Sequence, residues 1–442
     1  MNPQVQRIAE LESLVERQAK TISELESMVH QLLEEIARLK KQVGGGGSPL
    51  VIKASRPPKD NKARKKRNQG HSRKLCIHPD EVHFHTAEIC PDCGHALSGG
   101  WVHDVREVID IPPVKSLIIH HVRYARKCGV CKKRVLPSLN LSEQVLGRHR
   151  VSIRLMSIVA YLCEICRLPR RVVQSTLKTL FGVDISTGEI CEILHSMAQK
   201  GEKTYQQLQD QVRGSPFVHA DETGWREDGK NGYLWHFGTP DVSLFVYDKS
   251  RGHQVPEEFL GNEFKGVLVS DFYCGYYFYL GEHQRCWVHF LRDLHALKKE
   301  FAEDPSVLNW AESIHDLYLQ AREFSSENKK HRVEMRKQLQ QRLVELASPY
   351  SKIDCPQRIL AARLIRFEPE MFTFVEHVGV PSDNNAAERA IRPAVISRKI
   401  SGGTRSPHGS QTKSALMSLF STWKLQNLDG IQQCCNMLRE NT

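Results

Sequence analysis

The sequence predicts a multidomain protein with an N-terminal coiled coil, a small cysteine-rich ribbon, a helical region and an α/β core interrupted by an all-helical insertion. Three observations predict this organisation. A heptad repeat opens the chain, two CxxC pairs follow it, and short apolar strands beyond Gly214 give way to a long stretch without glycine. The length agrees, because 442 residues exceed what one hydrophobic core usually organises.

Residues 1–43 carry apolar side chains at seven-residue spacing and are expected to form a coiled-coil dimerisation helix. β-Branched residues at one heptad position and Leu at the other favour a parallel two-stranded coil, which would make the protein a homodimer. A helix packed against its own chain is the alternative, because Leu14, Met28 and Leu33 widen the apolar face. The repeat, broken only at Gln18, consists of Ile8, Val15, Ile22, Val29, Ile36 and Val43 at one position and Leu11, Leu25, Leu32 and Leu39 at the other.

Residues 44–75 are expected to form a flexible basic linker. The run Gly44 to Gly47, with Ser48 and Pro49 after it, ends the preceding helix. Ten Lys or Arg residues between Lys53 and Lys74 face a single acid, and such a block would bind the phosphates of DNA by releasing counterions. A merely solubilising linker is the alternative. The cations expected to contact DNA here are Lys62, Arg64, Lys65, Lys66 and Arg67.

Residues 76–137 contain two CxxC pairs separated by 34 residues and are expected to form a zinc ribbon. Two such turns can present four thiolates to one structural Zn²⁺ ion, here Cys90, Cys93, Cys128 and Cys131. Glycines follow Cys93 and Cys128, as the tight turns require. Val105 to Ile111 and Leu117 to Tyr124 have the pattern of strands, which predicts an inserted hairpin. Four free thiols are the alternative.

Residues 138–210 are expected to form a helical, helix-turn-helix-like domain. Apolar spacing predicts a helix from Val151 to Cys166, and Pro169 begins a second. Ser186 and Glu189 form a capping box for a third helix. Short helices joined at Gly182 resemble a helix-turn-helix, whose last helix would enter a major groove of DNA. A plain helical spacer is the alternative.

The segment after Gly214 has the element order of a ribonuclease H-like α/β domain. Strands are predicted at Phe217 to Asp221, Tyr233 to Phe237, Val242 to Tyr247 and Val267 to Asp271, with a helix near Glu257 to Leu260 before the fourth strand. Asp221 and Asp271 each close a strand, and neighbouring strand ends can bring two carboxylates together. A third acid would complete a site for two divalent metal ions, as in nucleases.

The motifs of this region resemble the catalytic blocks of the transposases of insertion-sequence family sixty-six. The resemblance covers order and spacing from the cysteine pairs to about residue 430, and departs mainly at the glycine run, where this family often has Ser and Pro. It implies a bacterial DDE enzyme in which Asp221, Asp271 and Glu388 hold two Mg²⁺ ions. The matching blocks are His219-Ala-Asp-Glu-Thr-Gly-Trp225, Gly266-Val-Leu-Val-Ser-Asp271 with Tyr276, Cys286-Trp-Val-His289 with Arg292, and Asn384-Asn-Ala-Ala-Glu388-Arg389 with Arg392-Pro393.

Each candidate site residue has an alternative interpretation. Asp383 rivals Glu388 but would simply cap the helix that follows, while Glu222 would point to the opposite face of its strand. Cys286 and His289 are either supporting active-site residues or packed core residues. The cations after the glutamate would contact DNA phosphates or pair with the acids; they are Arg389, Arg392, Arg398, Lys399 and Arg405.

Asp271 and Glu388 are 117 residues apart, which is more than a minimal core needs, so the excess must be an insertion. No glycine occurs from Glu282 to Val378, and the composition favours helix. The predicted domains are therefore a core in two parts, 211–295 and 379–442, around a helical insertion at 296–378. The resemblance suggests that this insertion helps to hold DNA.

The expected function is Mg²⁺-dependent cleavage and strand transfer of double-stranded DNA at transposon ends, with Mn²⁺ as a substitute and Zn²⁺ in a structural role. The absence of a phosphate-binding GxxxxGK[ST] motif argues against ATP use. No stretch resembles a membrane span or a cleavable leader, so we expect a cytoplasmic, nucleoid-associated protein. Accessory proteins of the same element are possible partners. The alternatives are a catalytically inactive dimeric zinc-ribbon DNA-binding protein and a ribonuclease H-like nuclease without strand transfer.

Overall fold

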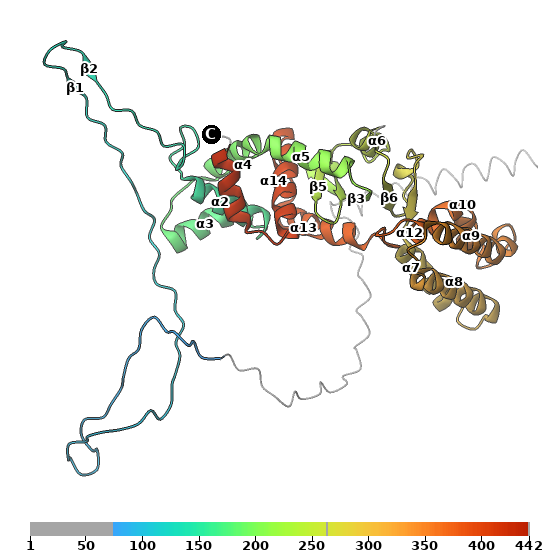
Figure 1. The fold of residues 1–442 in the computed structure, drawn as a ribbon, viewed down its shortest axis with the longest axis horizontal. Coiled ribbons are helices and arrows are strands. Elements are labelled where there is room, and N and C mark those ends of the chain that lie inside the picture. Colours follow the sequence, from blue (N-terminus) through green and yellow to red (C-terminus); the bar gives the residue numbers. More distant parts are fainter. Residues whose placement is uncertain (1–73, 262–263, 441–442) are drawn as a thin grey trace, which may run out of the picture. The chain divides into compact units, whose positions relative to one another are not determined.

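A computed structural model describes residues 74–261 and 264–440 (Figure 1). The chain divides into two compact units, Met1–Asp110 and Ile111–Thr442. The predicted coiled coil and almost all of the basic linker lie outside the described residues. Within the described part, no helix is both long and apolar enough to cross a membrane.

The predicted hairpin between the two cysteine pairs is wrong. Residues 105–111 and 117–124 form no strand, and their apolar side chains, such as Val108 and Leu117, are exposed. An alternating pattern becomes a strand only when its backbone pairs with another strand, and neither segment takes part in a strand pairing among the described residues. The short strands β1 (Arg126–Lys127) and β2 (Arg134–Val135) pair antiparallel around the second cysteine pair instead.

Among the described residues, four helices precede the sheet, and the three that the sequence predicts are confirmed. Ser152 and Ser186 cap α2 and α4, because each hydroxyl accepts a backbone N–H three residues on, at 3.2 and 3.0 Å. α3 follows Pro169 and ends at Gly182, whose φ of 65° suits glycine. The helices are α2 (Ile153–Glu164), α3 (Arg170–Phe181), α4 (Thr187–Lys200) and α5 (Glu202–Arg213).

A five-stranded mixed sheet follows, in the order β5-β4-β3-β6-β7. β3, β4 and β5 form an antiparallel meander, whereas β6 lies parallel to β3 and β7 parallel to β6. The helix α6 (Gln254–Leu260) connects β5 to β6, as expected. The strands are β3 (Phe217–Glu227), β4 (Lys230–Gly238), β5 (Ser243–Asp248), β6 (Val267–Ser270) and β7 (His283–Arg285).

The two faces of this sheet are buried by different elements. On one face, Val218 and Ala220 of β3 share a hydrophobic cluster with residues of α2, α4, α14 (Pro407–Leu425) and α15 (Gly430–Glu440). On the other face, Trp225 packs with Ile391 of α13 (Asn385–Ser401). Phe217, on the same face as Trp225, packs with Val267 and Val269 of β6. The alternation of a strand therefore assigns odd-numbered residues of β3 to the α13 face.

α14 also covers the outer edge of the sheet. Ser418 accepts the backbone N–H of Phe245 at 2.8 Å, and Thr422 accepts that of Ser243 at 3.1 Å. These hydroxyls lie one helical turn apart and satisfy the N–H groups of β5 that face away from β4. An edge strand left open is a template for association, and the helix removes that hazard.

The segment between β7 and α13 is helical, as the absence of glycine predicts, and has its own core. Trp287, Trp310, Leu343 and Phe372 are buried in one cluster with no member from the strands. Figure 1 shows these helices grouped together near β6. They are α7 (Trp287–Glu300), α8 (Pro305–Glu323), α9 (Lys329–Ser351), α10 (Arg358–Arg366), α11 (Glu368–Met371) and α12 (Thr373–Glu376).

Candidate active site

Asp221 and Asp271 occupy matching positions on neighbouring parallel strands. His219 of β3 is in register with Val269 of β6, and each aspartate follows two residues later. Both aspartates therefore belong to the α13 face of the sheet. Asp271 directly follows the last residue of β6, as predicted. Asp221 does not close its strand, because β3 continues to Glu227 in its hairpin with β4.

Asn384 fixes the start of α13 against these strands. Its side-chain amide donates to the carbonyl of Ala220 at 2.8 Å, and its side-chain oxygen contacts Nδ1 of buried His219 at 2.8 Å. Its backbone N–H donates to Sγ of Cys286 at 3.2 Å. Glu388 lies in the first turn of the helix that begins here. Asn384, to which the sequence alone assigned no role, thus connects the helix of Glu388 to the strand of Asp221.

The candidate acids influence one another electrostatically. Burial, then the negative charges of Glu222 and Asp271, and less strongly that of Glu388, raise the pKa of Asp221 to about 7. Backbone N–H groups of Glu222 and Tyr273 donate to Oδ1 of Asp221 and Asp271, both at 2.9 Å, and orient the two carboxylates. Crowded carboxylates disfavour ionisation unless a cation joins them.

Glu388 has an unsatisfied oxygen. Its Oε1 is buried and accepts no hydrogen bond, while Nε2 of His289 lies 3.5 Å away and a guanidinium nitrogen of Arg292 lies 3.8 Å away. A buried carboxylate oxygen without a donor suits a hard divalent cation. Among residues 74–261 and 264–440, however, no three His, Cys, Asp or Glu side chains lie close enough together to hold a metal ion. The donor chemistry fits Mg²⁺, although the carboxylates are not closed around one point.

Asp383 and Glu222, the two acids that rival the proposed metal ligands, bind other groups of the protein. Oδ1 of Asp383 accepts the backbone N–H of Asn385 at 2.9 Å, which is a capping contact. Glu222, on the opposite face from Asp221, accepts a guanidinium N–H of Arg251 at 2.8 Å and the hydroxyl of Tyr276 at 2.7 Å. Both oxygens of Glu222 are therefore used inside the protein.

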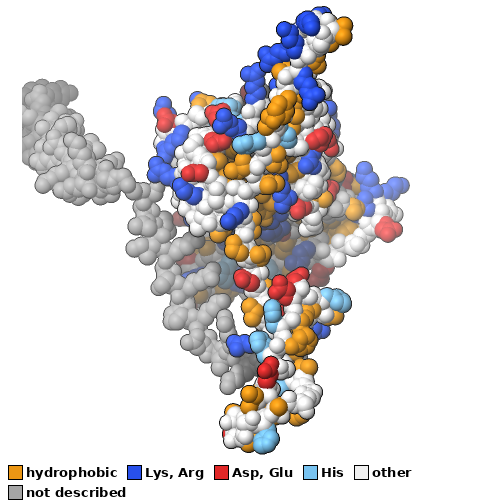
Figure 2. Space-filling view, turned by 90° about the vertical axis from the view of Figure 1, so that its left-hand side faces the viewer, with side chains coloured by type: hydrophobic (Ala, Val, Ile, Leu, Met, Phe, Trp, Pro, Cys, Tyr) orange, Lys and Arg blue, Asp and Glu red, His pale blue; other side chains and the backbone are white. Residues whose placement is uncertain are grey.

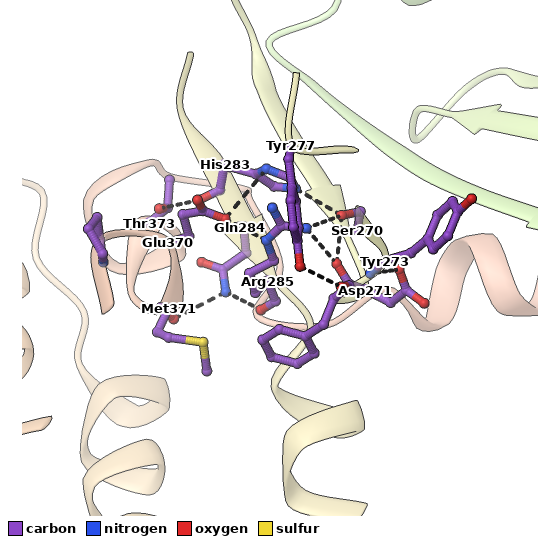
Figure 3. A network of polar contacts seen from close by, with 12 residues as sticks. Ser270, Asp271, Tyr273, Tyr277, His283, Gln284, Arg285, Glu370, Met371 and Thr373 are labelled. Atoms are coloured by element: carbon purple, nitrogen blue, oxygen red, sulfur yellow. Dashed lines mark hydrogen bonds and ion pairs between the residues drawn. The ribbon is translucent and has the colours of Figure 1, made fainter. Parts of the chain in front are cut away.

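A buried polar network supports the backbone of Asp271 (Figure 3). The side chain of Arg285 is 1% exposed, and its guanidinium donates to the carbonyl of Asp271 at 2.8 Å and to Oγ of Ser270 at 3.2 Å. The same guanidinium donates to Glu370 of α11 at 2.5 Å. Gln284 adds a second connection between β7 and the helical segment, because its side-chain oxygen accepts the backbone N–H of Phe374 at 2.9 Å. Sequence reasoning missed Arg285 and Glu370, since nothing local marks residues 85 positions apart as partners.

The cations after Glu388 differ in their surroundings. Arg389, Arg392 and Lys399 are exposed on α13, whereas Arg398 is half-buried and donates to the carbonyl of Gly224 in β3. Arg398 therefore has a structural partner in the protein itself. Figure 2 shows many other Lys and Arg side chains on the face that it draws, interspersed with acidic and apolar ones. They are densest at the projecting tip at the top of that view.

Each cysteine pair forms a tight turn of its own. Gly94, after Cys93, has a φ of 74°, and its N–H donates to the carbonyl of Cys90 at 3.0 Å. The equivalent position after Cys131 is Lys132, with a φ of 58° and an N–H that donates to the carbonyl of Cys128 at 3.0 Å. Lys132, and not Gly129, thus provides the left-handed residue of the second turn. Backbone N–H groups of the turns lower the pKa of Cys90 and Cys128, which favours the thiolates that zinc binds.

Comparisons with known proteins find family matches both for the part of the chain that contains the sheet and for the part that contains the cysteine pairs. Residues 148–412 match the model of the family described as "Transposase IS66 family", and residues 87–132 match the "zinc-finger binding domain of transposase IS66". The chain is also 30% identical over 159 residues to a protein named "Uncharacterized protein y4jO" of Sinorhizobium fredii (strain NBRC 101917 / NGR234). That alignment covers 36% of this chain and 48% of the relative, so the chain matches about half the length of that protein.

Proposed function

Because this chain belongs to the IS66 family of DDE transposases, we propose that it is a metal-dependent DNA transposase that cuts and rejoins double-stranded DNA at the ends of its own element. The observation that carries this proposal is the alignment of Asp221 and Asp271 on parallel strands, beneath a helix that presents Glu388. The strand order β5-β4-β3-β6-β7, with a meander followed by two parallel strands, supports a ribonuclease H-like core.

Asp221, Asp271 and Glu388 would hold two Mg²⁺ ions, with Mn²⁺ as a substitute. When bound, such ions supply Lewis-acid stabilisation of the charge that develops during displacement at phosphorus. The chain's own residues prepare this site. Asn384 holds the start of α13 on β3, Arg285 holds the backbone of Asp271, and His289 faces Glu388 at 3.5 Å. Cys286 is buried and accepts the N–H of Asn384, so its proposed part is positional.

The remaining parts of the chain are proposed to bind DNA and to associate. Cys90, Cys93, Cys128 and Cys131 would bind one structural Zn²⁺ ion in the zinc-finger region. The linker cations Lys62, Arg64, Lys65, Lys66 and Arg67, with Arg389, Arg392 and Lys399 of α13, would contact phosphates. The main role of Arg398 would be structural, through its hydrogen bond to the carbonyl of Gly224. We also propose that the chain dimerises through residues 1–43. The proposed domain boundaries lie at residues 43, 75, 137, 210, 295 and 378.

The test replaces each acid by its amide: Asp221→Asn, Asp271→Asn and Glu388→Gln. Each change keeps the shape but removes the charge that would hold Mg²⁺, so each should abolish cleavage of the element's ends and strand transfer while DNA binding persists. Duplexes that carry the inverted repeats flanking the gene are the substrate, and gel shift measures binding. Asp383→Asn is the matched control, because Asn keeps the oxygen that accepts the N–H of Asn385 and the change removes no proposed ligand.

The outcomes separate the alternatives. Cleavage without strand transfer by the unmodified protein would favour a nuclease, and tight binding without cleavage would favour an inactive DNA-binding protein. If Asp383→Asn lost activity while Glu388→Gln kept it, the assignment of the third acid would be wrong. Three amide variants that still cut DNA would overturn the proposed mechanism.

A further inference from the structure

A cavity of about 480 Å³ adjoins the candidate active site on the side of the helical insertion. Asp271, directly after β6, and His289 of α7 line one part of it, and Arg363, Arg366 and Phe367 line it from α10 and the residue that follows. Its volume is within the range of small-ligand pockets. The cavity therefore begins at a proposed metal ligand and ends at the insertion.

Aromatic rings form the wall next to Asp271. The ring centroid of Phe367 lies 5.3 Å from that of Phe272 and 5.6 Å from that of Tyr277. Tyr277 is 37% exposed whereas Phe367 is buried, so Tyr277 is the ring of this wall that is open to a ligand. Such rings stack on nucleobases without regard to their sequence. Figure 3 shows Tyr277 beside Arg285, whose guanidinium carbon lies 5.2 Å from the ring centroid.

The two arginines of α10 differ in availability. Arg363 is paired with Asp293 at 2.6 Å, so its charge is already offset. Arg366 is exposed, and no carboxylate among the described residues lies within ion-pairing distance of it. Its guanidinium carbon is 4.8 Å from the ring centroid of Tyr277 and 5.3 Å from that of Phe367. The cavity thus places one free cation over an aromatic wall.

We propose that this cavity binds one unpaired nucleotide of a DNA strand beside the proposed catalytic site, with its phosphate on Arg366 and its base on the exposed ring of Tyr277. The inference rests on the proposed function, which brings a phosphodiester to Asp271, and deepens it by assigning the neighbouring nucleotide. An arginine and an aromatic ring together match the two chemical parts of a nucleotide, whereas an inorganic anion would use only the arginine.

The test is a binding titration that needs no catalysis. The full chain is titrated with a short single-stranded oligothymidylate that carries one 2-aminopurine, whose fluorescence falls when the base stacks on an aromatic ring. Arg366→Gln should weaken binding by roughly tenfold, as the loss of a charged hydrogen bond does. Tyr277→Leu should remove most of the quenching. The matched control is Arg358→Gln, which removes the same charge from the same helix but lies outside the cavity lining.

Cleavage assays with the same variants separate this inference from the proposed function. Arg366→Gln should raise the KM for DNA ends more than it lowers kcat, while Arg358→Gln should behave like the unmodified protein. If Arg366→Gln and Tyr277→Leu bind and quench like Arg358→Gln, the nucleotide site is refuted even when cleavage stands. If inorganic phosphate competes as well as a nucleoside monophosphate does, the cavity is a simple anion site and the inference also fails.

Discussion

Arg285 is a fully buried cation whose charge is balanced from another part of the chain. Its side chain is 1% exposed, and its ion-pair partner Glu370 comes from α11, 85 residues later. A buried charge without its partner is strongly unfavourable, because the protein interior solvates ions poorly. The helical segment therefore neutralises the residue that holds the backbone of Asp271. The sequence predicted the aspartate but could not predict this support, which exists only once the chain has folded.

Glu370→Gln should lower the free energy of unfolding by about 3–5 kcal/mol, the usual cost of breaking a buried ion pair. Denaturant unfolding followed by tryptophan fluorescence measures the change. Glu368→Gln is the control on the same short helix, since no cation lies within ion-pairing distance of Glu368 among the described residues. Equal effects of the two variants would contradict the assigned role of the pair.

At the scale of single elements, apolar strands were predictable and polar ones were not. β3 and β6 begin with buried apolar residues, and the structure confirms that both strands start where this pattern predicts. β7 consists of His283, Gln284 and Arg285, all buried, and its polar composition gave no sign of a strand. The far half of β3 was missed for a similar reason, because pairing with β4 and not an apolar pattern extends it.

The helix α14 satisfies the edge of β5 with hydroxyls, and that arrangement is testable. Ser418→Ala removes the acceptor for the N–H of Phe245 in a buried place, so the free energy of unfolding should fall by about 1–3 kcal/mol. Ser421→Ala, three residues along the same helix, should cost much less, because no hydrogen bond of its side chain is found among the described contacts. Thermal unfolding of both variants decides the question.

On the scale of the whole molecule, the cysteine pairs and the N-terminal repeat define modules outside the sheet. The matching of residues 87–132 to a zinc-finger model agrees with the CxxC spacing that the sequence revealed. The hairpin expected between the pairs was wrong, since a strand pattern cannot supply its own partner. The repeat in residues 1–43 lies outside the described residues, so dimerisation stays a prediction.

Purified protein should contain about one zinc ion per chain, as a four-thiolate site requires. Removal of zinc by a chelator should expose residues 76–137 to proteolysis, because none of their apolar side chains is buried in a core that would hold the segment together. Elemental analysis and limited proteolysis measure both effects. A double variant Cys90→Ser and Cys128→Ser that retained a full complement of zinc would refute the site.

Deletion of residues 1–43 should convert a dimer into a monomer, since the heptad repeat provides the predicted self-association surface. Sedimentation equilibrium of the shortened and full-length chains gives their masses directly. The deletion should leave the thermal transition of the sheet-containing unit unchanged. An undiminished dimer would place the interface elsewhere.

The 117-residue separation of Asp271 from Glu388 has a consequence for biosynthesis. At roughly 5–20 residues per second, Asp271 leaves the ribosome about 6–23 seconds before Glu388. α13, which covers the acidic face of the sheet, is made after that interval, together with the third acid. A chain that ends within this interval would therefore carry the proposed DNA-binding modules but only two of the three proposed metal ligands. Under the proposed mechanism such a fragment would occupy DNA without cutting it, so the position of the insertion would delay cleavage until α13 has been made.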